Sequence, residues 1–412
     1  MTVIRNRRVI DIVKEGKPFF QDVGIVGLVP DNWGGPWMSR QQVLTRLGSY
    51  FEVIWVNPAP GWRQAWSGYR GKYPDRPIPG FEVYHASRWL SQVYRPRALA
   101  SFLAGRRLRE AQHLLRTKGC TRFVLYLWRP EFAYALDHLP FDVSCYHIVD
   151  EYSFSDVEEA ISQNEAALLR RVDQVYIHSP ASMDKKGHFN SNTLHAPNGV
   201  DYEAYMAPCN EPRDLALIPH PRIGYVGIVK KQLNLSLLHT LAQRHQNWSF
   251  VFVGPMGILG DKRGVFDDLI RAPNVYYLGS KEVNELPAYT QHLDVCTMCY
   301  EMNDYTKFIF PLKLHEYLAS GRPIVASPIR TLKDFDNIIH LASTVDEWSS
   351  AIVDAMHPIE TTVSAIAARR AIAHEYDWDR LVARIAEALC DRLGHEYGAR
   401  FRSIFTSSPP TT

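Results

Sequence analysis

Residues 303–327 read NDYTKFIFPLKLHEYLASGRPIVAS and combine a loop, a helix and a strand in immediate succession. Pro311 stands where the helix is expected to begin, because the missing N–H of a proline costs nothing at the first helical position. Gly321 is expected to end the helix, since glycine readily adopts the left-handed conformation needed there. The segment therefore predicts a helix over Lys313–Ser320 that leads into a buried strand at Ile324–Ala326.

Short apolar runs alternate with amphipathic stretches on both sides of this segment. Such runs, separated by helices, indicate parallel sheets covered on both faces. In the first half the predicted strands are Val23–Val29, Phe51–Val56, Phe123–Leu127, Val143–Val149 and Gln174–His178, and a helix is predicted from about Trp37 to Leu47. In the second half they are Arg222–Val226, Phe250–Val253, Val275–Leu278, Val295–Met298 and Ile324–Ala326, with another helix at Leu235–Arg244. The fold class predicted is α/β, with two doubly wound, Rossmann-like domains.

The rhythm breaks near Pro197-Asn198-Gly199-Val200, which predicts a turn, and the next twenty residues are rich in proline. We therefore expect a first domain at 1–205 and a second at 206–375. A helical segment at 376–406 is expected to pack back on the first domain, and 407–412 to be a disordered tail. Two such domains leave a cleft at the carboxyl ends of their strands, where open parallel sheets bind ligands.

Composition and charge narrow the function classes. The 412 residues carry a formal net charge of +2, which does not point to nucleic acid. No apolar run is long enough to span a bilayer, and residues 1–15 lack the apolar core of a signal peptide. The six scattered cysteines are typical of a reduced, cytoplasmic protein, and the lone Cys296–Cys299 pair lies inside an apolar strand.

The helix over Lys313–Ser320 offers chemistry as well as structure. A helix N-terminus carries free N–H groups and partial positive charge, which suits a diphosphate. Lys313 would add a full charge there, and Glu316, on the same face, could accept hydrogen bonds from two ribose hydroxyls. Asn303 and Thr306 in the preceding loop could donate to phosphate or sugar oxygens. On spacing alone, the alternative is an ordinary surface helix in which Lys313 and Glu316 form an ion pair.

The same segment resembles the donor-binding signature of GT-B glycosyltransferases. The matching residues are Asn303, Thr306, Pro311, Lys313, Glu316, Tyr317, Ala319, Gly321, Pro323, Ile324 and Val325. Three further stretches resemble the family in the correct order: Pro197–Asp201, Ile223–Gly227 and the Leu278-Gly279 and Leu286–Tyr289 pair. The groups most similar are the teichuronic-acid-type and xanthan-glucuronosyltransferase-like enzymes of bacterial surface polysaccharide synthesis.

The resemblance implies a GT-B fold and a nucleotide-sugar donor, with a UDP-sugar favoured. It implies that Lys313 neutralises the diphosphate, that Glu316 binds the ribose, and that Gly227 lets the backbone approach the phosphates beside Lys230. It implies no cofactor and no metal, and the histidines show no metal-ligand spacing. Retaining relatives carry a glutamate eight residues before the ribose-binding one. Phe308 stands there in this chain, so an inverting reaction and a role for Glu301 both stay open.

The first domain offers a candidate general base. An inverting transfer needs a group that removes the proton from the acceptor hydroxyl. Asp150 and Glu151 follow the strand Val143–Val149, and the similar family segment has its acidic pair at the same point. We expect Asp150 to be the base, with Glu151 as the second catalytic candidate. The alternative is that Asp150 caps a following helix.

Residues 95–118 form a basic amphipathic stretch, with seven cations against one acid. Such a helix could lie on an anionic membrane and bring the cleft to a lipid-linked acceptor. The alternative is a helix with its apolar face in the domain core.

Three functions remain open on these observations. The first is transfer of a sugar to a glycan or lipid-linked hydroxyl in polysaccharide or glycolipid synthesis. The second is a nucleotide-sugar epimerase of the same fold. The third is a non-catalytic nucleotide-sugar-binding partner in an assembly complex. The predicted location is the cytoplasm, with peripheral attachment to the inner face of the membrane as an option.

Overall fold

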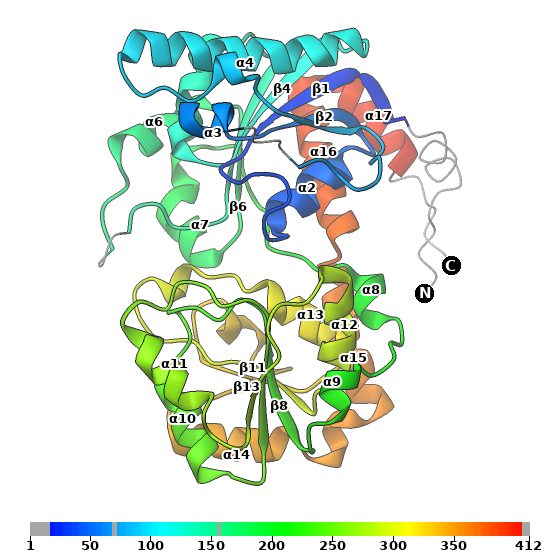
Figure 1. The fold of residues 1–412 in the computed structure, drawn as a ribbon. Coiled ribbons are helices and arrows are strands. Elements are labelled where there is room, and N and C mark those ends of the chain that lie inside the picture. Colours follow the sequence, from blue (N-terminus) through cyan, green and yellow to red (C-terminus); the bar gives the residue numbers. More distant parts are fainter. Residues whose placement is uncertain (1–16, 68–71, 155–157, 406–412) are drawn as a thin grey trace.

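Two parallel sheets, each covered by helices, stand one above the other in the computed structural model of the chain, which describes residues 17–67, 72–154 and 158–405 (Figure 1). The first has seven strands in the order β3-β2-β1-β4-β5-β6-β7 and the second six, in the order β10-β9-β8-β11-β12-β13. Every registered strand pair is parallel. The α/β class and the two doubly wound, Rossmann-like domains predicted from the sequence are confirmed.

The strands of the first sheet are short and, at its centre, fully buried. Their bounds are β1 Phe20–Leu28, β2 Phe51–Val56, β3 Phe81–Tyr84, β4 Arg122–Leu127, β5 Val143–Ile148, β6 Gln174–Ile177 and β7 Thr193–His195. The helices between them are α2 Ser39–Leu47, α3 Trp62–Trp66, α4 Arg97–Thr117, α5 Ala135–His138, α6 Gln163–Arg171 and α7 Pro180–Lys186. Short 3₁₀ turns lie at η1 Arg88–Leu90, η2 Pro130–Tyr134 and η3 Gly187–Phe189.

The second sheet repeats this plan. Its strands are β8 Arg222–Val226, β9 Ser249–Val253, β10 Val275–Tyr277, β11 Val295–Met298, β12 Ile324–Ala326 and β13 His340–Leu341. The helices are α8 Tyr202–Met206, α9 Arg213–Ala216, α10 Leu235–Arg244, α11 Arg263–Leu269, α12 Leu286–Gln291, α13 Leu312–Ser320, α14 Val345–Ala355 and α15 Val363–Glu375. Shorter turns are η4 Gly260–Lys262, η5 Val283–Glu285, η6 Thr306–Phe308, η7 Leu332–Phe335 and η8 Pro358–Thr361.

The end of the described chain returns to the first domain. Helix α16 (Trp378–Leu393) rises from the lower to the upper domain in Figure 1, and α17 (His395–Phe405) packs against it. Eight residues of α16 are buried, and they join the core on one face of the first sheet. Burial of these apolar side chains stabilises the attachment of the second domain to the first.

The chain passes between the domains twice, and the two passages lie side by side. The backbone of Val200 pairs with that of residues 376 and 378 through two hydrogen bonds of 3.0 Å. Tyr205 already belongs to the core of the second domain. The second domain therefore begins a few residues before the boundary placed after residue 205 from the sequence. The tail predicted at 407–412 lies outside the described residues.

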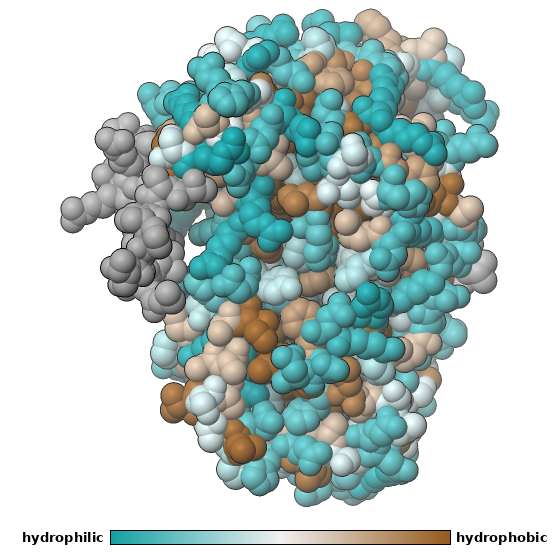
Figure 2. Space-filling view, turned by 180° about the vertical axis from the view of Figure 1, so that it is seen from behind, coloured by the Kyte–Doolittle hydropathy of each residue, from teal (hydrophilic) through white to brown (hydrophobic). Residues whose placement is uncertain are grey.

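The sequence pattern missed three of the four edge strands and predicted the fourth, β10. β3, β7 and β13 have four, three and two residues, and β7 and β13 are only partly buried. β7 (Thr193-Leu194-His195) and β13 (His340-Leu341) include polar residues and therefore give no apolar run, whereas the equally short β12 is entirely apolar and was predicted. The face shown in Figure 2 is mostly hydrophilic, with apolar residues in separate groups, as expected where amphipathic helices cover each sheet.

Candidate functional site

Two glycine turns form the edge of the second domain that faces the first. Gly227 follows β8 with φ +145°, and Gly254 follows β9 with φ +135°, values that favour glycine. The turns are packed together: a Cβ on Gly254 would lie 2.3 Å from the carbonyl oxygen of Gly227. The N–H groups of Gly227 and Gly254 donate to the carbonyl oxygens of Val253 (2.7 Å) and Gly279 (2.8 Å), which holds the two turns in place. Neither glycine has a side chain of its own that would keep a ligand away from the backbone.

Lys313 lies directly on this turn. A Cβ on Gly227 would lie 2.1 Å from Cε and 2.5 Å from Nζ of Lys313. The ammonium also stands 5.0 Å from the centre of the Tyr225 ring. The hydroxyl of Tyr317 accepts a hydrogen bond from the backbone N–H of Val226 (2.9 Å), which fixes α13 beside β8. The N-terminus of α13, the lysine and the glycine turn thus converge on one place, as a diphosphate site requires.

The ends of α13 differ slightly from the prediction. Pro311 is the residue before the helix, with an extended ψ of 125°, and Leu312 is the first helical residue. Gly321 ends the helix at φ +75°, as expected.

Lys230 and Glu316 flank Lys313. Burial lowers the pKa of Lys230, and the charge of Lys313 lowers it further, while Asp150 of the other domain raises it. Burial raises the pKa of Glu316, although Lys313 and the Tyr205 hydroxyl oppose that rise. Lys230 is therefore near enough to be affected by both Lys313 and Asp150, and Lys313 also acts on Glu316. Of the predicted donor-binding residues, Gly227, Lys230, Lys313 and Glu316 are brought together.

Asn303 and Thr306 have a different placement. The side-chain oxygen of Asn303 accepts hydrogen bonds from the backbone of Tyr305 (3.1 Å) and Thr306 (3.0 Å). The Thr306 hydroxyl donates to the carbonyl oxygen of Asn303 (3.1 Å) and is only 1% exposed. The polar groups of both residues hold the shape of the loop itself. A direct contact with a donor remains a prediction for this pair.

Asp150 stands in the cleft at the carboxyl end of β5. Its Oδ1 accepts hydrogen bonds from the backbone of Glu151 (2.9 Å) and from the hydroxyl of Tyr305 (2.9 Å), which belongs to the second domain. The carboxylate is otherwise exposed, and its charge reaches Lys230. It caps only its own turn, since the next helix, α6, starts at Gln163 and is capped by Ser162. A carboxylate so placed can accept a proton from a hydroxyl bound in the cleft.

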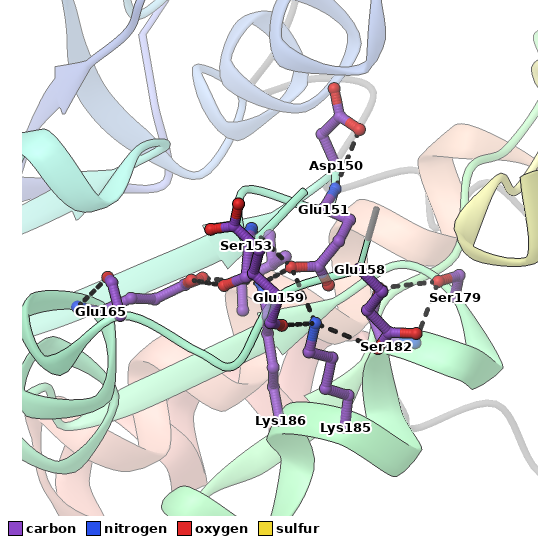
Figure 3. Close-up of polar contacts among 12 residues, drawn as sticks. Asp150, Glu151, Ser153, Glu158, Glu159, Glu165, Ser179, Ser182, Lys185 and Lys186 are labelled. Carbon is purple, nitrogen blue, oxygen red and sulfur yellow. Dashed lines mark hydrogen bonds and ion pairs between the residues drawn. The ribbon is translucent and has the colours of Figure 1, made fainter. Parts of the chain in front are cut away.

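Glu151 points the other way, and its assignment as a catalytic residue needs correction. The side chain has no exposed surface, and Oε1 lies 3.0 Å from Nζ of Lys186, which is also fully buried. Lys186 also pairs with Glu165 at 2.8 Å. Figure 3 shows Glu151 directed into this cluster while the Asp150 carboxylate points out of it. The two neighbouring acids thus point to opposite sides of the backbone, and only Asp150 faces the cleft (Figure 3).

Sequence reasoning missed the residues that link the buried cluster of Glu151, Glu165 and Lys186 to the second domain. Lys185 lies 3.2 Å from Glu158, and Lys307 of the second domain lies 2.5 Å from the same carboxylate. Together with Tyr305 and Asp150, this makes two polar links across the cleft. A lysine and a tyrosine in a loop give no sequence signal for such a role, because their partners are about 150 residues away.

Phe308 and Glu301 bear on the question of stereochemistry. Phe308, at the position of the glutamate found in retaining relatives, is 3% exposed and lies beneath the ammonium groups of Lys185 and Lys307. Glu301 is held by an ion pair with Lys262. Beside Phe308, a cavity of about 640 Å³ opens between α7 and the loops after β11 and β12.

The residues considered for metal or redox chemistry have structural surroundings. Cys296 and Cys299 are buried, and burial raises the pKa of the Cys296 thiol to about 12. His147 stacks on Trp128 and is hydrogen-bonded to the Tyr126 hydroxyl (2.8 Å), so it packs within the first sheet. In the described part of the chain, no three His, Cys, Asp or Glu side chains are grouped so that they could hold a metal ion.

Comparisons with known proteins agree with this geometry. The family model described as glycosyl transferases group 1 matches residues 220–357, which contain the glycine turns and α13. The TuaH protein of Bacillus subtilis (strain 168), provisionally named a teichuronic acid biosynthesis glycosyltransferase, is 28% identical over 247 residues. That match covers 55% of this chain and 59% of the relative, so it spans less than two thirds of either.

Solved structures resemble nearly the whole chain. Anabaena Alr3699/HepE, in complex with UDP and glucose, superposes with a TM-score of 0.66 at 17% identity, over 89% of this chain and 99% of its own. The Escherichia coli trehalose-6-phosphate protein bound with UDP-2-fluoro glucose has a TM-score of 0.63 at 12% identity, over 90% and 99%. At such identities the likeness establishes the fold.

Proposed function

We propose that this protein is a glycosyltransferase, because residues 220–357 match the family model described as glycosyl transferases group 1 and the chain has a GT-B fold. It would move a sugar from a nucleotide diphosphate, a UDP-sugar by preference, to a hydroxyl of a glycan or lipid-linked acceptor in surface polysaccharide or glycolipid synthesis. The observation that carries the proposal is the position of Lys313 against the Gly227 turn at the start of α13. The UDP named with solved relatives and the TuaH match support the donor and the pathway class.

The donor roles follow from charge and hydrogen bonding. Lys313 and the helix N-terminus neutralise the diphosphate, and Lys230 lies close enough to share the charge. Glu316, as a carboxylate, accepts hydrogen bonds from ribose hydroxyls. The leaving group of the reaction is the nucleoside diphosphate, so the same cations stabilise the negative charge that develops on it. Such a site works without a divalent metal, and activity should survive a chelator.

Asp150 supplies the base on the opposite wall. It removes the proton of the acceptor hydroxyl as that oxygen bonds to the anomeric carbon and the bond from this carbon to the diphosphate oxygen breaks. The hydrogen bond from Tyr305 holds the carboxylate in place. A single displacement of this kind inverts the anomeric centre, and the buried aromatic ring at Phe308 in place of a carboxylate favours that outcome. NMR of the product would reveal the configuration.

A ligand screen tests the proposal. UDP-, GDP-, ADP- and dTDP-sugars would be compared by thermal shift, because a ligand at 100 times its dissociation constant stabilises a protein by about 2.7 kcal/mol. We expect a UDP-sugar to give the largest shift and Lys313→Ala to abolish it. Arg271→Ala, an exposed cation of the same domain, serves as the control.

The outcome separates the candidate functions. Release of UDP only when an acceptor is present identifies a transferase, and release from the donor alone identifies an epimerase. Binding of UDP-sugars with no turnover on any donor and acceptor would indicate a non-catalytic partner. If the Lys313→Ala and Glu316→Ala variants had the same affinity for UDP-sugars as the unaltered protein, the donor site would have to lie elsewhere.

A further inference from the structure

Three tryptophans of the first domain are unusually exposed. Trp62 and Trp66 on α3 are 60% and 56% exposed, and Trp89 on η1 is 68% exposed. The rings of Trp66 and Trp89 meet edge to face with their centres 5.4 Å apart. A cluster of large, solvent-exposed aromatic side chains is typical of a surface that binds a partner or a membrane.

Arginines accompany the tryptophans. The Arg88 guanidinium lies 5.0 Å from the ring centre of Trp66 and 5.3 Å from that of Trp89, and Arg63 lies 5.3 Å from that of Trp62. Neither arginine has a carboxylate partner among the described residues. The chain from residue 86 to 109 contains no acidic residue and six arginines: Arg88, Arg95, Arg97, Arg106, Arg107 and Arg109. The exposed aromatic groups therefore stand in a strongly positive field.

The first turns of α4 extend this surface. Leu99 is 44% and Phe102 60% exposed, whereas Leu108, Ala111 and Leu115 further along the helix are buried in the core. The basic stretch at 95–118 is therefore divided. The second half packs into the domain core, and the first half exposes apolar side chains that could contact a membrane. From the sequence, the whole stretch 95–118 was a candidate membrane-binding helix, and the structure limits that role to its first half.

Hydrogen bonds hold the three elements together. Buried Arg107 of α4 donates to the carbonyl oxygen of Leu90 (2.8 Å) and to the side chain of Gln92 (3.1 Å). The backbone N–H of Gln92 donates to the carbonyl oxygen of Pro60, just before α3 (2.8 Å). The surface is thus fixed to the domain, so its side chains can act together.

We propose that Trp62, Trp66, Trp89, Leu99 and Phe102, with Arg63, Arg88 and Arg97, form a membrane-docking surface for an anionic lipid leaflet. Tryptophan suits the boundary between headgroups and acyl chains because it is apolar with one polar edge. Arginines add attraction to anionic headgroups. A second copy of the chain fits less well, because a symmetric contact would bring like charges together without an acidic counterpart.

The surface lies beyond the edge of the first sheet that also carries Asp150. The segments that carry α3 and η1 leave the carboxyl ends of β2 and β3, the same edge of the sheet from which Asp150 enters the cleft. Docking there would bring the cleft near a lipid-linked acceptor, an advantage that rests on the proposed function. The structure has no helix, within the residues it describes, that is long and apolar enough to cross a membrane.

Vesicle co-sedimentation of the full chain tests the proposal. We expect binding to vesicles that contain phosphatidylglycerol and phosphatidylcholine, weaker binding at high salt, and little binding to phosphatidylcholine alone. The triple variant Trp62→Ala/Trp66→Ala/Trp89→Ala should bind at least about 10-fold more weakly, and so should Arg63→Glu/Arg88→Glu. The matched control is Leu217→Ala/Ile258→Ala/Val363→Ala, which removes three side chains at least 81% exposed in the second domain.

The possible results are distinct. Equal loss in the control, or no vesicle binding by the unaltered chain, would overturn the proposal. The unaltered protein could instead be a dimer in solution. If the tryptophan variant alone were monomeric, the surface would be assigned to contact with a second copy of the chain. UDP-sugar binding, measured without lipid, should be the same in all variants. Normal UDP-sugar binding would show that the variants are folded. If neither the unaltered chain nor any variant bound a UDP-sugar, that result would count against the proposed function and not against the membrane-docking surface.

Discussion

The two walls of the cleft use their charges in opposite ways. On the second domain, Lys313 lies against a glycine turn, and its charge helps to lower the pKa of the neighbouring Lys230. On the first domain, Glu151 and Lys186 neutralise each other out of reach of water. Like charges held together need a ligand to balance them, whereas paired charges hold a fold. We therefore assign ligand recognition to the wall formed by the second domain. The charged residues on the wall of the first domain mainly stabilise the fold, except for Asp150.

Asp150→Asn should have the largest effect on the reaction. Asparagine keeps an oxygen that can accept the hydrogen bonds from Tyr305 and Glu151 but cannot take up a proton. We expect kcat to fall by a factor of about 10²–10⁴, the usual contribution of a general base, with UDP-sugar affinity unchanged. Single-turnover kinetics and isothermal titration would measure the two effects. Unchanged kcat would show that another group is the base.

Glu151→Gln, one residue along the chain, should affect stability instead. It leaves buried Lys186 with a single carboxylate, that of Glu165. Loss of one partner from a buried ion pair costs on the order of 3 kcal/mol. We expect a lower urea midpoint and nearly normal kcat in the folded fraction. If stability were kept while kcat fell as in Asp150→Asn, the two acids would act together in catalysis and the contrast between the walls would fail.

Gly227→Ala tests the recognition wall. At φ +145° an L-residue is strained, and the added methyl would overlap Cε of Lys313 and push the ammonium from its place. We expect UDP-sugar affinity to fall by about 10- to 100-fold, or about 1.4–2.7 kcal/mol. Gly264→Ala on α11 is the matched control, because no atom lies within 4 Å of its added methyl. Equal affinities for the two variants would show that the turn does not position Lys313 for the donor.

The same contrast explains how much the sequence could predict. Gly321 is constrained by the geometry of a helix end, so a short pattern locates it. Gly227, Lys313 and Glu316 were located through the resemblance to a family signature, because spacing alone also allowed a surface ion pair between Lys313 and Glu316. Asp150 was preferred as the base, but Glu151 was kept as a second candidate, because sequence alone cannot show which of two neighbours faces the cleft. Lys186 and Glu165 are ordinary charged residues in a sequence, and only the packing of two helices buries them together.

The pH dependence of donor binding should show the smallest effect. Burial raises the pKa of Glu316 above its ordinary value, and only the carboxylate accepts two hydrogen bonds from a ribose. Affinity should therefore decline by several-fold as the pH falls from 7.5 toward that raised pKa. A UDP-sugar is the ligand of choice, because both of its phosphates are esterified and keep their charge over this range. Glu316→Gln should bind more weakly at pH 7.5 but lose this decline, since its amide does not titrate. A decline that persisted unchanged in Glu316→Gln would place the titrating group elsewhere and leave the ribose without its proposed partner.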